Sequence, residues 1–143
     1  MSLLFYNLDL TKARQVALAI QLNPWLRITG TEVLEGWAKS LSLEFEDYDD
    51  FVKKYGSFLS GKPIPMAIAT ISNYYEGVGT LLHRKLIDIS RIEELVGGIT
   101  LTWEKVKPIV EGFSKDFDSP MLLEWFEYLY NEIQEREQQL AKV

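Results

Sequence analysis

The stretch PIPMAIATISNYYEGVGTLLHRKLI, residues 63–87, decides the fold of this chain. Its apolar residues recur every three or four positions, which is the spacing of one face of an α-helix. The apolar face consists of Ile64, Ile68, Ile71, Tyr75, Val78, Leu82 and Leu86, whereas Ser72, Asn73, Glu76, Thr80 and His83 gather on another side. A helix that is apolar around much of its circumference needs neighbours to cover it. We therefore expect an all-α, single-domain helical bundle, residues 1–143, around this long central helix.

Proline, glycine and acidic residues mark further helices before the central one. We expect a first helix over residues 9–22, which Asn23-Pro24 ends, and a second that begins within residues 29–32. The acidic residues 44–50 precede a third, because carboxylates are favoured beside the exposed amides of a first helical turn. Its apolar residues are Phe51, Val52, Tyr55, Phe58 and Leu59.

The sequence after the central helix predicts three more helices. A short one should start at Asp88 or Ser90 and end at Gly97-Gly98, where glycine favours a helix C-terminus. The next should start at Thr100 or Thr102 and contain Pro108, which should bend its axis or shift its start. The last should start at Ser119-Pro120 and become polar beyond Glu135, so we expect residues 135–143 to fray or project.

Composition excludes several classes of function. The chain has 143 residues, 47% of them hydrophobic, and no cysteine, which rules out disulfides and thiolate metal sites. The net charge is -6 and the basic residues are scattered, so neither nucleic acid nor an anionic membrane surface is an expected partner. The longest uncharged stretch, residues 63–75, is too short and too polar to span a membrane. With no basic segment before the apolar N-terminus, we expect no signal peptide and a cytoplasmic, acidic protein.

Two residues of the central helix are candidates for chemistry. Glu76 could act as a general base if burial raised its pKa. The alternative, which we favour because buried charges are usually paired, is that Glu76 bonds an Arg, a Lys or a Tyr hydroxyl and fixes how helices dock. His83, the single histidine, lies about 10 Å from Glu76 along the helix axis, too far to share a metal ion. We expect no metal site and no cofactor.

Aromatic residues crowd the last third of the chain. Tyr128 and Tyr130 cannot both lie on the helix side taken by Trp125 and Leu129. Two apolar faces on one helix indicate either deep burial or a subunit interface, where Tyr and Trp are enriched. The candidate interface residues are Trp103, Trp125, Tyr128 and Tyr130.

Four pieces of sequence carry a resemblance to a known family. They are NYYE at 73–76 with Val78, Gly79 and Leu81-Leu82, then LID at 86–88, WEKVKPI at 103–109 and WFEYL at 125–129. In this order they resemble a family of short helical proteins of bacteria and archaea classed as a domain of unknown function, over residues 52–130. The resemblance implies a helical fold and no activity, and it singles out Asn73, Glu76, Trp103, Lys107 and Pro108. Many members carry an N-terminal membrane span; this chain differs, so we expect no membrane role.

These observations favour a protein-interaction or scaffold module over an enzyme. We expect it to bind a protein partner or a second copy of itself through aromatic helix faces. The alternative is a small-molecule binding protein or enzyme with a pocket beside the central helix at Glu76. Its polar network would contain Asn73, Glu76, His83 and Lys107.

Overall fold

The computed structural model describes residues 14, 38–92 and 96–142. In chain order the elements are α3 (Tyr48–Tyr55), α4 (Pro63–His83), the 3-10 turn η2 (Ile89–Arg91), α5 (Val96–Asp116) and α6 (Glu124–Ala141). Residues 38–41 are also helical, and no strand occurs in the described ranges. The all-α bundle predicted from the sequence is confirmed. The predicted first helix, apart from residue 14, and the start of the second lie outside the described residues.

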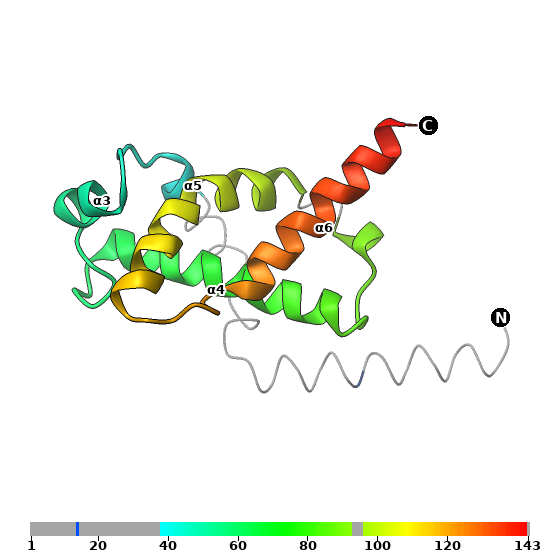
Figure 1. Ribbon diagram of the computed structural model, residues 1–143, viewed down its shortest axis with the longest axis horizontal. Helices are drawn as coiled ribbons and strands as arrows, with labels where there is room; N and C mark the ends of the chain where they lie inside the picture. Colours follow the sequence, from blue (N-terminus) through cyan, green and yellow to red (C-terminus); the bar gives the residue numbers. More distant parts are fainter. Residues whose placement is uncertain (1–13, 15–37, 93–95, 143) are drawn as a thin grey trace, which may run out of the picture.

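Helix α4 is the central element of this part of the chain, and α6 crosses it (Figure 1). Its buried residues are Pro65, Ile68, Ile71, Ser72, Tyr75, Gly77, Val78, Gly79 and Leu81. Pro63 occupies the first helical turn, where its missing N–H costs nothing. The predicted enclosed central helix is therefore present.

This helix ends at His83, four residues before the predicted end at Ile87. Lys85 adopts a left-handed backbone with φ of 59°. The amides of Lys85 and Leu86 donate back to the carbonyls of Leu82 and Leu81, each at 3.0 Å. This pair of bonds is a Schellman motif, which normally has glycine at the left-handed position. The end was missed because a lysine takes that position.

Helix α3 begins as predicted and ends earlier. The side chain of Asp47 caps it by accepting a hydrogen bond from the amide of Asp50 at 2.8 Å. The helix stops at Tyr55 because Gly56 turns to a φ of 100°. Phe58, predicted to lie in the helix, follows in the connection and still stacks on Phe51, with ring centroids 5.9 Å apart.

The predicted break at Gly97-Gly98 is wrong, as are the starts at Thr100 and Thr102. Helix α5 begins at Val96 and runs through both glycines, and among the described residues between α4 and α5 the three-residue turn η2 is the helical element. A glycine inside a helix costs about 1 kcal/mol relative to alanine. Burial of one large apolar side chain stabilises by about 1.5–3 kcal/mol, and Ile99 and Trp103 in the next turns are 0% and 3% exposed. Packing therefore outweighs the local preference of glycine.

Pro108 lies inside α5, as predicted. A proline removes one hydrogen bond of the helix and clashes with the preceding turn. Figure 1 shows α5 changing direction along its length. The part of α5 after the proline faces α3 and the N-terminal half of α4, and its residues Ile109, Val110 and Phe113 become important below.

Helix α6 begins at Glu124, not at Ser119-Pro120 as predicted. Residues 120–123 form turns, and Leu123 has a left-handed backbone with φ of 55°. The helix buries Phe126, Leu129 and Ile133. Beyond Ile133 it stays helical to Ala141, six of these eight residues are exposed, and this part of the helix projects from the body (Figure 1).

Candidate functional site

Glu76 holds the start of α6. Its two carboxylate oxygens accept hydrogen bonds from the backbone amides of Trp125, at 3.3 Å, and Phe126, at 2.8 Å. The first amides of a helix have no acceptor within the helix, and the residue in the capping position, Leu123, has no side-chain acceptor. Helix α4 thus supplies the cap that α6 lacks. This is a helix-docking role, with backbone amides in place of the Arg, Lys or Tyr partner expected from the sequence.

The Glu76 carboxyl is half-buried, and its surroundings act on it in two directions. Burial raises its pKa above the ordinary value, and the negative charge of Glu124 raises it further. The two amide hydrogen bonds lower the pKa, but burial outweighs them. The position that lets Glu76 accept both amide hydrogen bonds therefore also destabilises its charged form relative to its neutral form.

Gly79, one turn further along α4, lets the backbone of α6 come close. A Cβ atom added at Gly79 would overlap the carbonyl oxygen of Trp125. Only glycine permits such an approach of two backbones. One further turn along, the exposed ring of His83 stacks on the Trp125 ring, with centroids 4.1 Å apart, and meets Tyr128 edge-on at 5.3 Å. Glu76, Gly79 and His83 therefore form one stripe on α4 that receives Trp125, which we call the α4–α6 junction.

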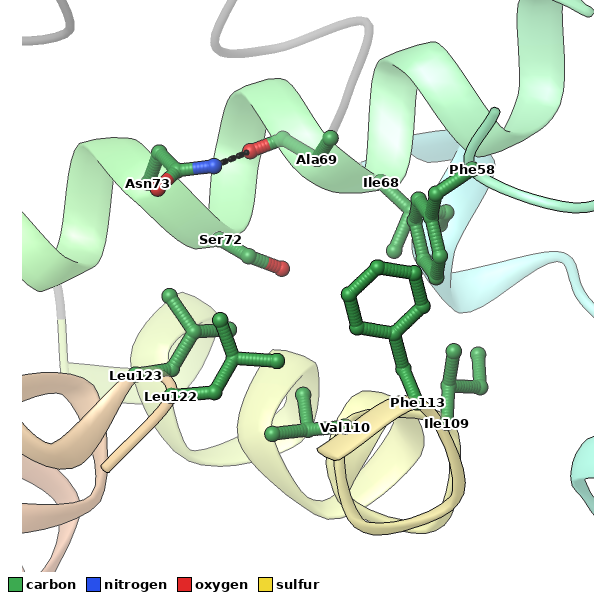
Figure 2. Close-up of a pocket in the computed structure, with 10 residues that line it drawn as sticks. All are labelled: Phe58, Ile68, Ala69, Ser72, Asn73, Ile109, Val110, Phe113, Leu122 and Leu123. Atoms are coloured by element: carbon green, nitrogen blue, oxygen red, sulfur yellow. Dashed lines mark hydrogen bonds between the residues drawn. The ribbon is translucent and has the colours of Figure 1, made fainter. Parts of the chain in front are cut away.

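A cavity lies beside α4, and its lining residue Asn73 is one helical turn before Glu76 (Figure 2). It has a volume of about 190 Å³. Its walls come from α4, the second half of α5, the connection between α3 and α4, and the connection between α5 and α6. The lining residues are Phe58, Ile68, Ala69, Ser72, Asn73, Ile109, Val110, Phe113, Leu122 and Leu123. None of them is charged, and seven are partly exposed, so the cavity opens to solvent.

Ser72 provides the buried polar atom of this cavity. The residue is 3% exposed, and its hydroxyl has no hydrogen-bond partner among the residues that the structure describes. Two other hydroxyls of the same helix, Thr70 and Thr80, each donate to the carbonyl four residues earlier at 2.9 Å. Figure 2 shows the Ser72 oxygen directed into the space between Phe113 and Leu122. Asn73 lies beside it and donates its amide hydrogen to the Ala69 carbonyl at 2.8 Å.

The four residues predicted as a polar network lie in three places. Asn73 lines the cavity, whereas Glu76 and His83 belong to the α4–α6 junction. Lys107 is exposed on α5, where its ammonium group lies 3.9 Å from the carboxylate of Glu111. The structure does not bring these four side chains together, and Glu76 does not line the cavity.

The four predicted interface residues are all partly or fully buried. Trp103 is 3% exposed and packs on Phe126, with ring centroids 4.9 Å apart, so it belongs to the core and not to a surface. Trp125 and Tyr128 are half-buried at the junction, and Tyr130 donates a hydrogen bond to the Glu104 carboxylate at 3.1 Å. The sequence did not point to Ser72, because a small polar residue beside an apolar face is common in any packed helix.

Among residues 38–92 and 96–142, no three His, Asp or Glu side chains lie close enough to hold a metal ion. None of the helices in the described part of the chain has both the length and the apolar character that crossing a membrane requires.

Comparison with known proteins gives one match. A family model described as "Domain of unknown function (DUF4760)" matches residues 32–133. No curated protein and no solved structure matches the chain significantly. The matched range contains α3, α4, α5 and α6 as far as Ile133, and so both the α4–α6 junction and the cavity. The family resemblance noted in the sequence is thereby confirmed, and the chain belongs to the DUF4760 family of domains of unknown function.

Proposed function

We propose that this protein binds a small apolar molecule in the cavity beside α4. The observation that supports the proposal is an uncharged cavity of about 190 Å³, open to solvent, with a buried hydroxyl inside it. Protein interiors are close-packed and have few voids larger than a water molecule. Ligand pockets are concave and mostly apolar, with a small number of polar groups that orient the ligand. The cavity has these properties.

Binding accounts for the lining better than catalysis does. A serine becomes a nucleophile when a base lies within hydrogen-bond reach of its hydroxyl. His83 is eleven residues from Ser72 on α4, about 16 Å along the axis, and its ring is stacked on Trp125. The carboxylate of Glu76 is engaged by two backbone amides. We therefore propose a binding protein.

A pair of matched substitutions on α4 tests this function. Ala69 lines the cavity, whereas Ala67 lies two residues earlier on the same helix and does not line it. Ala69→Met should fill the cavity, and Ala67→Met should leave it open. A ligand that binds the folded state raises the melting temperature, so millimolar toluene should raise Tm for the wild type and Ala67→Met but not for Ala69→Met. The proposal would be contradicted if toluene left the Tm of the wild type unchanged and the wild type left the NMR signals of toluene unchanged.

A second function, protein interaction, is supported by a different observation. Phe117 and Met121, in the connection between α5 and α6, are 49% and 65% exposed. Phe117 stacks on the cavity residue Phe113, with ring centroids 4.4 Å apart, so this apolar surface adjoins the cavity. We propose a second copy of the chain as its partner, because a surface patch can meet its own equivalent in a two-fold symmetric dimer.

Oligomeric state tests this second function. The expected result is a dimer at micromolar concentration by sedimentation velocity, and Met121→Lys should convert it to a monomer. Leu140→Lys is the control, because Leu140 is 58% exposed at the far end of α6. A wild-type monomer at 100-fold higher concentration would rule out self-association through this surface.

A further inference from the structure

The shape and polarity of the cavity narrow the class of its ligand. Resting on the proposed binding function, we infer that the cavity takes a neutral, single-ring molecule with one hydrogen-bonding group, and that this group bonds the Ser72 hydroxyl.

Size sets the first limit. An apolar cavity of about 150 Å³ is known to hold benzene in another protein. A cavity of about 190 Å³ therefore has room for one six-membered ring and a short substituent. The rings of Phe58 and Phe113 are in edge-to-face contact, with their centroids 5.3 Å apart and their planes at 86°. Aromatic side chains in this arrangement offer both edges and faces to a further ring, which favours an aromatic ligand.

Charge sets the second limit. Within residues 38–92 and 96–142, no Lys, Arg, His, Asp or Glu lines the cavity. A charge buried without a partner is strongly unfavourable, so a carboxylate or an ammonium group should be excluded. The ligand should be neutral at physiological pH.

The Ser72 hydroxyl sets the third limit on the ligand, which concerns its hydrogen-bonding group. Serine in a helix can satisfy its hydroxyl by donating to the carbonyl four residues earlier, as Thr70 and Thr80 do here. Ser72 makes no such bond although it is 3% exposed. A hydroxyl both donates and accepts, so a ligand hydroxyl or carbonyl would pair with it. A buried water molecule needs two to four polar partners. Among the described lining residues, Ser72 and Asn73 are the polar ones, so the cavity suits a mostly apolar ligand better than a bound water.

Phenol and toluene test the inference, because they have the same shape and differ in one hydroxyl. Their affinities are measured by NMR titration on the full chain in the wild type, in Ser72→Ala and in Thr70→Ala. The ratio of phenol affinity to toluene affinity should fall about fivefold in Ser72→Ala, the effect of one net hydrogen bond. In Thr70→Ala it should stay within twofold, because the Thr70 hydroxyl bonds the Met66 carbonyl and lies outside the cavity lining. Ala69→Met should abolish binding of both.

The outcomes separate this inference from the proposed function. If toluene and phenol both bind but Ser72→Ala leaves their ratio unchanged, the cavity binds ligands and the role given to Ser72 is wrong. Benzoate that binds as tightly as phenol at neutral pH would overturn the requirement for a neutral ligand. If neither toluene nor phenol binds the wild type, the proposed binding function itself fails.

Discussion

The carboxylate of Glu76 on α4 lies 2.8 Å from the backbone amide of Phe126 on α6, fifty residues later in the chain. Helix caps are normally provided by the residue just before the first turn. Here the cap comes from another helix, so the start of α6 depends on a tertiary contact. The same contact fixes where α6 crosses α4, next to the close approach at Gly79.

Removal of this cap should destabilise the protein. Glu76→Ala leaves the amides of Trp125 and Phe126 without acceptors, and loss of a helix cap costs about 0.5–2 kcal/mol. Urea denaturation should show this decrease in the free energy of unfolding. Glu135→Ala, an exposed carboxylate on the projecting part of α6, is the control and should change it by less than about 0.5 kcal/mol. An unchanged midpoint for Glu76→Ala would mean that α6 starts without the cap.

The pH dependence of stability should reveal the buried charge of Glu76. Its pKa is raised in the folded protein above the ordinary 4.5, so the folded state binds the proton more tightly than the unfolded state does. Stability from this group is therefore fully present below pH 4.5 and is lost as pH rises through the folded pKa. The free energy of unfolding of the wild type, relative to Glu76→Gln, should decrease from pH 4 upward and then level off. A relative increase with pH would show that the two amide bonds outweigh burial.

Gly79→Ala should destabilise the protein although alanine favours helices. In an open helix this change stabilises by about 1 kcal/mol. At Gly79 the new Cβ overlaps the Trp125 carbonyl oxygen, and such overpacking costs about 1–3 kcal/mol or more. Thermal and urea denaturation should both show a loss. A more stable Gly79→Ala variant would refute the close approach of α4 and α6.

Ser72→Ala should leave the ligand-free protein as stable as the wild type or slightly more stable. No hydrogen bond is lost, because the Ser72 hydroxyl has no partner, and alanine has a higher helix propensity by about 0.5 kcal/mol. Urea denaturation measures the change. Thr80→Ala is the comparison, since it removes the bond to the Glu76 carbonyl. A loss above about 1 kcal/mol for Ser72→Ala would indicate that a water or another group pairs with the hydroxyl.

The sequence predicted the helices better than their ends. The three- to four-residue spacing in α4 was enough, because burial of a whole helix face dominates local preferences. Helix ends depended on packing: Gly56 ends α3, but Gly97 and Gly98 lie inside α5. Glycine ends one helix and lies inside the other because Ile99 and Trp103 are buried just after Gly97-Gly98.

The candidate site was less predictable. Glu76 stood out because it is a charge on a largely apolar helix, but its partners are backbone amides, which have no sequence signature. The cavity could not be foreseen, because its walls come from segments that are far apart in the sequence: the connection before α4, α4 itself, α5 and the connection before α6. Thr100 and Thr102 also have buried hydroxyls without a described partner, so Ser72 became distinctive only when the structure placed its hydroxyl in the cavity wall.

The position of α6 gives the cavity a mechanical connection to the far end of the molecule. Leu122 and Leu123 line the cavity, and α6 begins at the next residue. The helix has 18 residues, and most of its residues after Ile133 are exposed. At 1.5 Å per residue it is about 27 Å long, so a tilt of about 5° at its anchored end would displace its tip by about 2 Å. If a bound ligand moved the two leucines and tilted α6 as a rigid rod, a spin label or fluorophore at Leu140 would detect the displacement of the helix end.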